Sequence, residues 1–118
     1  MSDTENRQHY FVCEQDDLAD GEMLKVNLPE QAPIVVYRVG GLFFATDDTC
    51  THGEASLSEG ELDDDYIIEC PFHNGTFDIR TGEAVDFPCI VPLKVYPVMV
   101  EEGRVFINLE FGKTCNDG

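Results

Sequence analysis

Residues 50–73 read CTHGEASLSEGELDDDYIIECPFH, and this stretch contains the residues that point most strongly to the chemistry of the chain. It opens with the pair Cys50-Thr51-His52 and closes, after 17 intervening residues, with the pair Cys70-Pro71-Phe72-His73. The protein has only three histidines, so two such tight cysteine–histidine pairs are improbable by chance. Thiolates and imidazoles in this pattern are typical of metal ligands. The sequence therefore predicts one metal centre, with the ligands Cys50, His52, Cys70 and His73.

Two thiolates and two imidazoles suit two kinds of centre. One is a tetrahedral zinc ion that only holds the fold. The other is a [2Fe–2S] cluster with the cysteines on one iron and the histidines on the other. Structural zinc usually stabilises domains too small to build a core, whereas this chain has several strands' worth of core residues. The single residue between Cys50 and His52 is also shorter than zinc-finger spacing. The pattern favours iron–sulfur, with a zinc-bound structural module as the alternative.

Length and charge narrow the class of protein further. The chain has 118 residues, which suits a single domain over 1–118. Its 24 acidic and 7 basic residues give a formal charge of −17, which excludes binding to nucleic-acid phosphates. No apolar run approaches the roughly 20 residues that span a bilayer, so no membrane role is expected. The polar start of the chain does not resemble a signal peptide, and the expected location is the cytoplasm.

The hydrophobic pattern predicts an all-β fold, an antiparallel sandwich or barrel. Gly40-Gly41 marks a hairpin, and a last hairpin is expected around residues 101–103, with Pro97 at an edge or a bulge. A short helical turn or loop is expected over 14–21, with Asp16 or Asp17 as its cap. Both cysteine–histidine pairs follow strands, so the tips of neighbouring hairpins are expected to share the centre. The predicted strands cover 9–13, 22–28, 34–39, 42–46, 66–69, 76–79, 93–100 and 104–109.

The two pairs resemble the two-box motif of Rieske proteins, and the resemblance extends from Tyr10 to Leu109. It includes Gly53, the run 74–78 and the turn 80–82. The chain is most similar to the ferredoxin components of bacterial aromatic-ring-hydroxylating dioxygenases. The resemblance implies a Rieske-like fold of antiparallel sheets with a cluster-binding subdomain formed by two hairpin loops. It also implies one Rieske [2Fe–2S] cluster, with Cys50 and Cys70 on one iron and His52 and His73 on the other.

The residues that remain after the cluster favour an electron carrier over an enzyme. Only His9 is left, so the two-histidine, one-carboxylate site that activates oxygen cannot form. Gly40-Gly41 is a turn and not a nucleotide-binding fingerprint. No small-molecule substrate is therefore expected. The chain is expected to take electrons from a flavin-dependent NAD(P)H reductase and to pass them to a terminal oxygenase. A small subunit of a nitrite-reductase-type complex is the alternative.

Acidic residues concentrate around the two pairs. Residues 47–86, the expected cluster-binding segment, hold 12 of the 24 acids and a single base, Arg80. A negative field there would steer basic patches of partner proteins into transient electrostatic docking. For the run Asp63-Asp64-Asp65 alone, a solvated loop is an equal interpretation.

The other cysteines are not expected to bind metal. Cys13 and Cys89 lie among apolar residues and read as small buried hydrophobes. Cys115 lies in a polar tail, 112–118, and reads as exposed. A loop containing Pro88 is expected to cover the cluster or to be an ordinary turn, and Phe72 to shield the cluster or simply to pack.

Departures from respiratory Rieske proteins bear on the reduction potential. In those proteins each box contains one extra cysteine, and the two extra cysteines form a disulfide. The matching positions in this chain are Ala55 and Phe72. They also have a tyrosine that hydrogen-bonds a ligand sulfur, where this chain has Phe77. Thr76 is left as a hydroxyl donor.

We predict a midpoint potential near the low end of the Rieske range, about −150 mV. Fewer hydrogen bonds to the sulfurs leave the more negative, reduced cluster less stabilised. A redox titration of the purified protein measures this potential, and a midpoint well above zero would contradict the argument.

Overall fold

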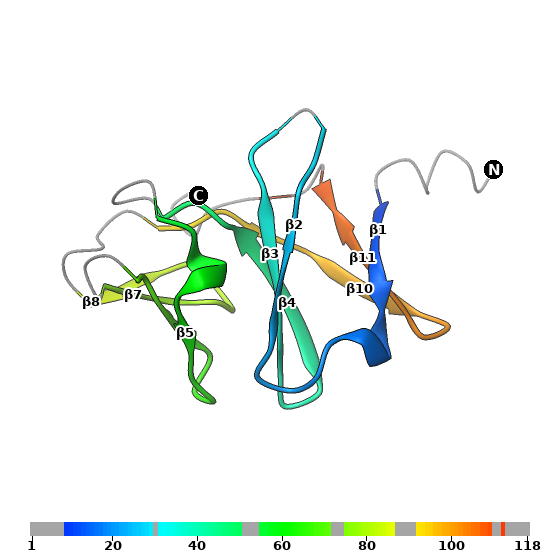
Figure 1. Cartoon of the computed structure of the whole chain (residues 1–118), viewed down its shortest axis with the longest axis horizontal. Coiled ribbons are helices and arrows are strands. Elements are labelled where there is room, and N and C mark those ends of the chain that lie inside the picture. The colour runs from blue at the N-terminus through cyan, green and yellow to red at the C-terminus, as the bar shows by residue number, and fades with distance from the viewer. Residues whose placement is uncertain are drawn as a thin grey trace.

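The computed structural model describes residues 9–29, 31–50, 55–71, 75–86, 92–109 and 112. These residues form three antiparallel sheets, which lie along the long axis of the molecule (Figure 1). The terminal sheet has the order β1 (His9–Glu14), β11 (Arg104–Asn108), β10 (Val98–Glu101). The central sheet has the order β2 (Met23–Val26), β3 (Ile34–Val39), β4 (Leu42–Asp47), β9 (Val95–Tyr96). The small sheet has the order β5 (Glu61–Leu62), β6 (Ile67–Glu69), β7 (Thr76–Asp78), β8 (Ala84–Asp86). The predicted all-β class is confirmed.

Strand β3 separates two hydrophobic cores. Every residue of β3 except Arg38 is buried, because both faces of this strand are covered. Alternate side chains point to opposite faces of a strand, so Val35, Tyr37 and Val39 enter one core and Ile34 and Val36 enter the other. The first core, called here the cysteine core, also contains Cys50 and Cys70. The site is thus built on one face of the central sheet.

The predicted hairpin at Gly40-Gly41 is confirmed. Val39 pairs with Leu42 across it, and both glycines have positive φ, 61° and 80°, as the favoured two-residue hairpin turn requires. The carboxylate of Asp20 accepts the N–H groups of both glycines, at 3.1 and 2.9 Å. These two hydrogen bonds therefore hold the hairpin turn against the loop before β2, which contains Asp20.

The strand predicted over 93–100 is two strands. Val95–Tyr96 pairs with β4 in the central sheet, whereas Val98–Glu101 pairs with β11 in the terminal sheet. Pro97 lies between them and has no N–H to continue a ladder, so the chain changes sheets there. The predicted edge or bulge is instead this crossing. The last turn is also tighter than predicted, because Glu101 already pairs with Arg104.

Two short 3-10 helices complete the description. η1 (Gln15–Asp17) lies in the predicted turn 14–21, and the carboxylate of Asp17 accepts the N–H of Glu14 at 3.1 Å. η2 (Leu57–Glu59) lies between β4 and β5 and was not predicted. Within the described part of the chain, no helix has the length and apolarity to cross a bilayer.

Candidate metal centre

Cys50 and Cys70 each begin a loop that is closed by one backbone hydrogen bond. The N–H of Cys50 donates to the carbonyl of Ala55 at 2.9 Å, and the N–H of Cys70 donates to that of Gly75 at 2.8 Å. An antiparallel pair lies directly outside each loop, Thr49 with Ser56 and Glu69 with Thr76. The first loop (50–55) and the second loop (70–75) therefore have equal length and equal closure, with a cysteine at the first position.

Both cysteines are buried in one core. Cys50 is 2% exposed and Cys70 is 1% exposed, and the two belong to the same hydrophobic cluster. Neither is part of a disulfide. The structure thus brings the two predicted thiol ligands to one place. The predicted ligands His52 and His73 lie outside the described residues, as do Gly53, Phe72, Pro88, Cys89 and Cys115.

The surroundings of the thiols fit a metal-bound state. Ala55 and Phe77 are buried in the cysteine core and bring no ionisable group to it. Burial raises the pKa of Tyr37, whose hydroxyl lies 2.8 Å from Oγ1 of Thr46, so this phenol stays neutral. Two thiols at the heads of matched loops, in apolar surroundings, suit thiolates whose charge a metal compensates.

Cys13 and His9 lie away from this core. Cys13 is buried on β1, as predicted, and burial together with Asp17 and Glu14 raises the pKa of its thiol. His9 is the first residue of β1, and its Nε2 lies 3.5 Å from Nδ2 of Asn108 on β11. His9 is therefore half-buried in the terminal sheet.

Sequence reasoning missed the segment that joins the two loops. Next to the first loop, the carboxylate of Asp48 accepts the hydroxyl of Ser56 at 2.5 Å and the N–H of Ser58 at 2.9 Å. Next to the second loop, a Cβ on Gly60 would lie only 1.9 Å from the carbonyl oxygen of Glu69 and 3.2 Å from Cδ of Pro71. Helix η2 is thus held tightly at both ends. The sequence signal was available, as Asp48 two residues before Cys50 and Ser56 directly after Ala55, but neither stands out without the fold.

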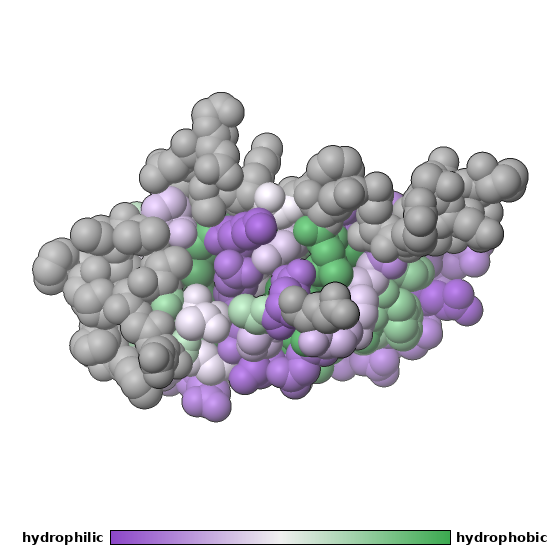
Figure 2. All heavy atoms as spheres, turned by 90° about the horizontal axis from the view of Figure 1, so that it is seen from above, coloured by the Kyte–Doolittle hydropathy of each residue, from purple (hydrophilic) through white to green (hydrophobic). Residues whose placement is uncertain are grey.

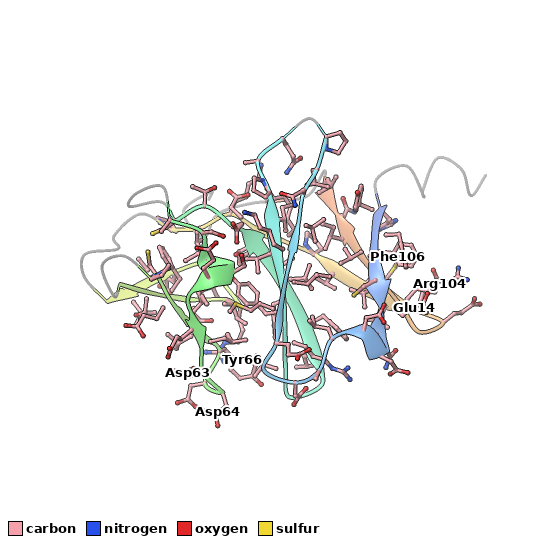
Figure 3. The ribbon with its side chains drawn as sticks, viewed as in Figure 1. Glu14, Asp63, Asp64, Tyr66, Arg104 and Phe106 are labelled. Atoms are coloured by element: carbon pink, nitrogen blue, oxygen red, sulfur yellow. The ribbon has the colours of Figure 1, made fainter. Side chains whose placement is uncertain are left out.

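Six acidic residues of this segment lie in two separate groups. Glu59, Glu61 and Glu69 line a hollow of about 370 Å³ whose wall also includes Cys70 and Pro71. The run Asp63-Asp64-Asp65 instead lies in the β5–β6 turn, at the opposite end of β6 from Cys70, and Figure 3 shows Asp63 and Asp64 at the tip of that turn. Oδ1 of Asp63 accepts the N–H groups of Asp65 and Ile67 there. This position favours the solvated-loop interpretation for the run.

The one base of the segment is engaged locally. Arg80 donates two hydrogen bonds to Asp78, at 3.0 and 2.8 Å, and its guanidinium lies 4.5 Å from the ring centroid of Tyr66. Hydrogen bonding to Arg80 lowers the pKa of Asp78 below its usual range. Asp78 therefore stays ionised and offsets the charge of Arg80, so the segment as a whole remains strongly negative.

The fit at Gly60 generates a prediction. Gly60→Ala forces η2 away from the second loop, and overpacking of this kind costs about 1–3 kcal/mol of folding free energy. We expect the variant to bind less metal per chain, measured by elemental analysis. Gly21→Ala is the control, because Gly21 has positive φ but nothing within 4 Å of the added Cβ. It should lower stability and leave metal content intact; equal metal loss in both variants would contradict the argument.

Comparisons with known proteins agree with this geometry. Residues 8–97 match the Rieske [2Fe-2S] domain family. The ferredoxin component of the p-cumate 2,3-dioxygenase system of Pseudomonas putida is 52% identical over 83% of this chain and 83% of its own length. The solved complex of reduced oxygenase and oxidised ferredoxin in carbazole 1,9a-dioxygenase includes a chain that is 50% identical, with a TM-score of 0.84 over 87% of this chain and 94% of that one. The ferredoxin of Sphingomonas yanoikuyae B1 is 47% identical, with a TM-score of 0.79 over 83% and 95%.

Relatives of this identity and coverage are named as ferredoxin components of oxygenase systems, which are electron-transfer proteins and not the catalytic parts. The chain therefore belongs to the Rieske [2Fe–2S] family, as a ferredoxin that carries electrons on one Rieske cluster.

Proposed function

We propose that this ferredoxin passes single electrons from a flavin-dependent NAD(P)H reductase to the terminal oxygenase of an aromatic-ring-hydroxylating dioxygenase system. The observation that carries the proposal is the pair of matched loops with buried cysteines at their first positions. Two of the named relatives support it: one is the ferredoxin component of the p-cumate 2,3-dioxygenase system, and the other was solved in complex with the oxygenase of carbazole 1,9a-dioxygenase.

Within this proposal, Cys50 and Cys70 hold one iron of the cluster and His52 and His73 hold the other. The bound cluster supplies a one-electron couple. The chain's own contribution is rigidity and exclusion of water: both cysteines are fixed by backbone hydrogen bonds and buried in the cysteine core. We take 47–86 as the cluster-binding segment of a single domain over 1–118, with 112–118 as a polar tail.

The acidic hollow beside Cys70 supports docking of a basic patch on each partner. Glu59 and Glu61 are exposed and Glu69 is half-buried, so their carboxylates face solvent next to a proposed ligand. Hydrophilic and apolar side chains are interleaved over the described part of the face in Figure 2. A charged hollow that opens to solvent, such as the one beside Cys70, suits brief, electrostatically steered encounters rather than a permanent interface.

The cytoplasm is the compartment that this role requires, because NAD(P)H supplies the electrons. A reducing compartment also suits the thiols of Cys13, Cys50 and Cys70, none of which is part of a disulfide.

The proposed ligand set makes a testable prediction. His52→Ala and His73→Ala should each abolish the native Rieske electron paramagnetic resonance signal and lower iron and sulfide content, while circular dichroism still reports a β fold. His9→Ala, which changes the third histidine, should keep the signal. A native signal in either proposed ligand variant would exclude that histidine. Colourless wild-type protein with one zinc would exclude the cluster itself.

The proposed docking at the acidic hollow makes a further prediction. Glu59→Gln combined with Glu61→Gln should slow electron transfer to the oxygenase roughly tenfold at low ionic strength, because charge steers the encounter. The difference should shrink as salt screens the field. Stopped-flow rates across a salt series measure this.

Asp64→Asn combined with Asp65→Asn is the matched control. It removes the same charge from the opposite end of β6 and should change the rate much less. If the two double variants slow transfer equally, the hollow beside Cys70 is not the docking site.

A further inference from the structure

Asp48 is the one charged residue that is buried among the residues the structure describes. It is 1% exposed, and a carboxylate out of water is costly unless its oxygens are paired. Its oxygens accept the hydroxyl of Ser56 and the N–H of Ser58, and Oδ2 lies 3.7 Å from Nζ of Lys25 on β2. Both carboxylate oxygens of Asp48 therefore have partners, and none of these partners is a proposed metal ligand.

The backbone of Asp48 is held as firmly as its side chain. Its N–H donates to the carbonyl of Pro33 at 3.0 Å, and its carbonyl accepts the N–H of Leu57 at 2.7 Å. Asp48 stands two residues before Cys50, while Ser56 directly follows Ala55, which closes the first loop. Asp48 thus joins the strand that enters the first loop to the chain that leaves it.

The second loop needs no such residue. The position equivalent to Asp48, two residues before Cys70, is Ile68, a buried apolar side chain in the cysteine core. The second loop also continues a ladder of three pairs between β6 and β7. The first loop stands on one isolated pair, Thr49 with Ser56. The sheet therefore holds the second loop in place, whereas the contacts of the Asp48 carboxylate hold the first loop in place.

The same contacts extend to the second loop through η2. Ser58, whose N–H donates to the Asp48 carboxylate, lies within η2, and Gly60 is the residue directly after this helix. Gly60 is packed so closely on the carbonyl of Glu69 that no Cβ fits between them. A shift of Asp48 would therefore also move η2 and Gly60, which pack against Glu69 at the end of the strand before Cys70.

We propose that Asp48 is a positioning residue for the cluster: its buried carboxylate, bound by Ser56, Ser58 and Lys25, orients the first loop and sets its separation from the second. The proposal rests on the proposed ligand set, because it requires Cys50 to hold an iron. Asp48 does not touch the cluster in this account, and its effect passes through the loop that carries Cys50.

The test compares three variants with the wild-type holoprotein. Asp48→Ala removes all the carboxylate contacts, Asp48→Asn keeps an oxygen acceptor for Ser58 but loses the ion pair, and Ser56→Ala removes one hydroxyl. The readouts are the g values of the reduced cluster and the rate at which excess iron chelator bleaches its visible absorbance. Outer-sphere partners of a metal site are typically worth 10–100-fold in affinity. We expect Asp48→Ala to lose its cluster about 10–100-fold faster, with shifted g values, and the other two variants to change in the same direction by less.

Asp63→Asn is the matched control, because the Asp63 carboxylate likewise accepts two hydrogen bonds from nearby residues, the N–H groups of Asp65 and Ile67, but does so in the β5–β6 turn. It should keep the wild-type signal and bleaching rate. If circular dichroism shows that Asp48→Ala does not fold, Asp48→Asn and Ser56→Ala decide the matter. Folded variants that unfold at lower temperature, yet keep wild-type g values and bleaching rates, would show a purely structural role and overturn the proposal.

Cys50→Ser separates this inference from the ligand set. Loss of the native signal in Cys50→Ser, together with wild-type behaviour of the Asp48 variants, would refute the positioning role alone. A native signal retained in Cys50→Ser would refute the ligand set, and with it the positioning role.

Discussion

Two backbone hydrogen bonds, Cys50 N–H to Ala55 and Cys70 N–H to Gly75, are the constraint on which the rest of this structure depends. Each closes a loop of the same length and fixes a cysteine at its first position, so both thiols enter one buried core. Such rigidity favours electron transfer, because a rigid scaffold rearranges little when the redox centre gains or loses an electron. The loops lie at the end of an all-β framework, which provides that rigid base.

The central strand explains how so small a protein supports both a core and a cofactor. β3 is buried on both faces and sends alternate side chains into two cores. One core joins the central and terminal sheets, and the other receives the two cysteines and one side chain from each strand of the small sheet. The arrangement also places the thiols and the acidic side chains in different surroundings. The apolar cysteine core surrounds the thiols, while carboxylates line the solvent side next to Cys70.

Much of this was predictable because the signals are local. The spacing of the cysteine–histidine pairs, the Gly40-Gly41 turn and the alternation before Pro29 each depend on neighbouring residues. What sequence reasoning missed depends on contacts between distant segments. Pro97 marks a change of sheet partner that only the register reveals, β5 is too short to show a period, and Asp48 looks like one more acid until Ser56 and Lys25 are placed around it.

The central claim is that one cluster is held by two thiolates on one iron and two imidazoles on the other. Pulsed electron paramagnetic resonance of the reduced protein, labelled with ¹⁵N only in histidine, tests it most directly. The account predicts hyperfine couplings from two directly bound histidine nitrogens. A reduced cluster without coupling to a directly bound histidine nitrogen, or with only one, would contradict it.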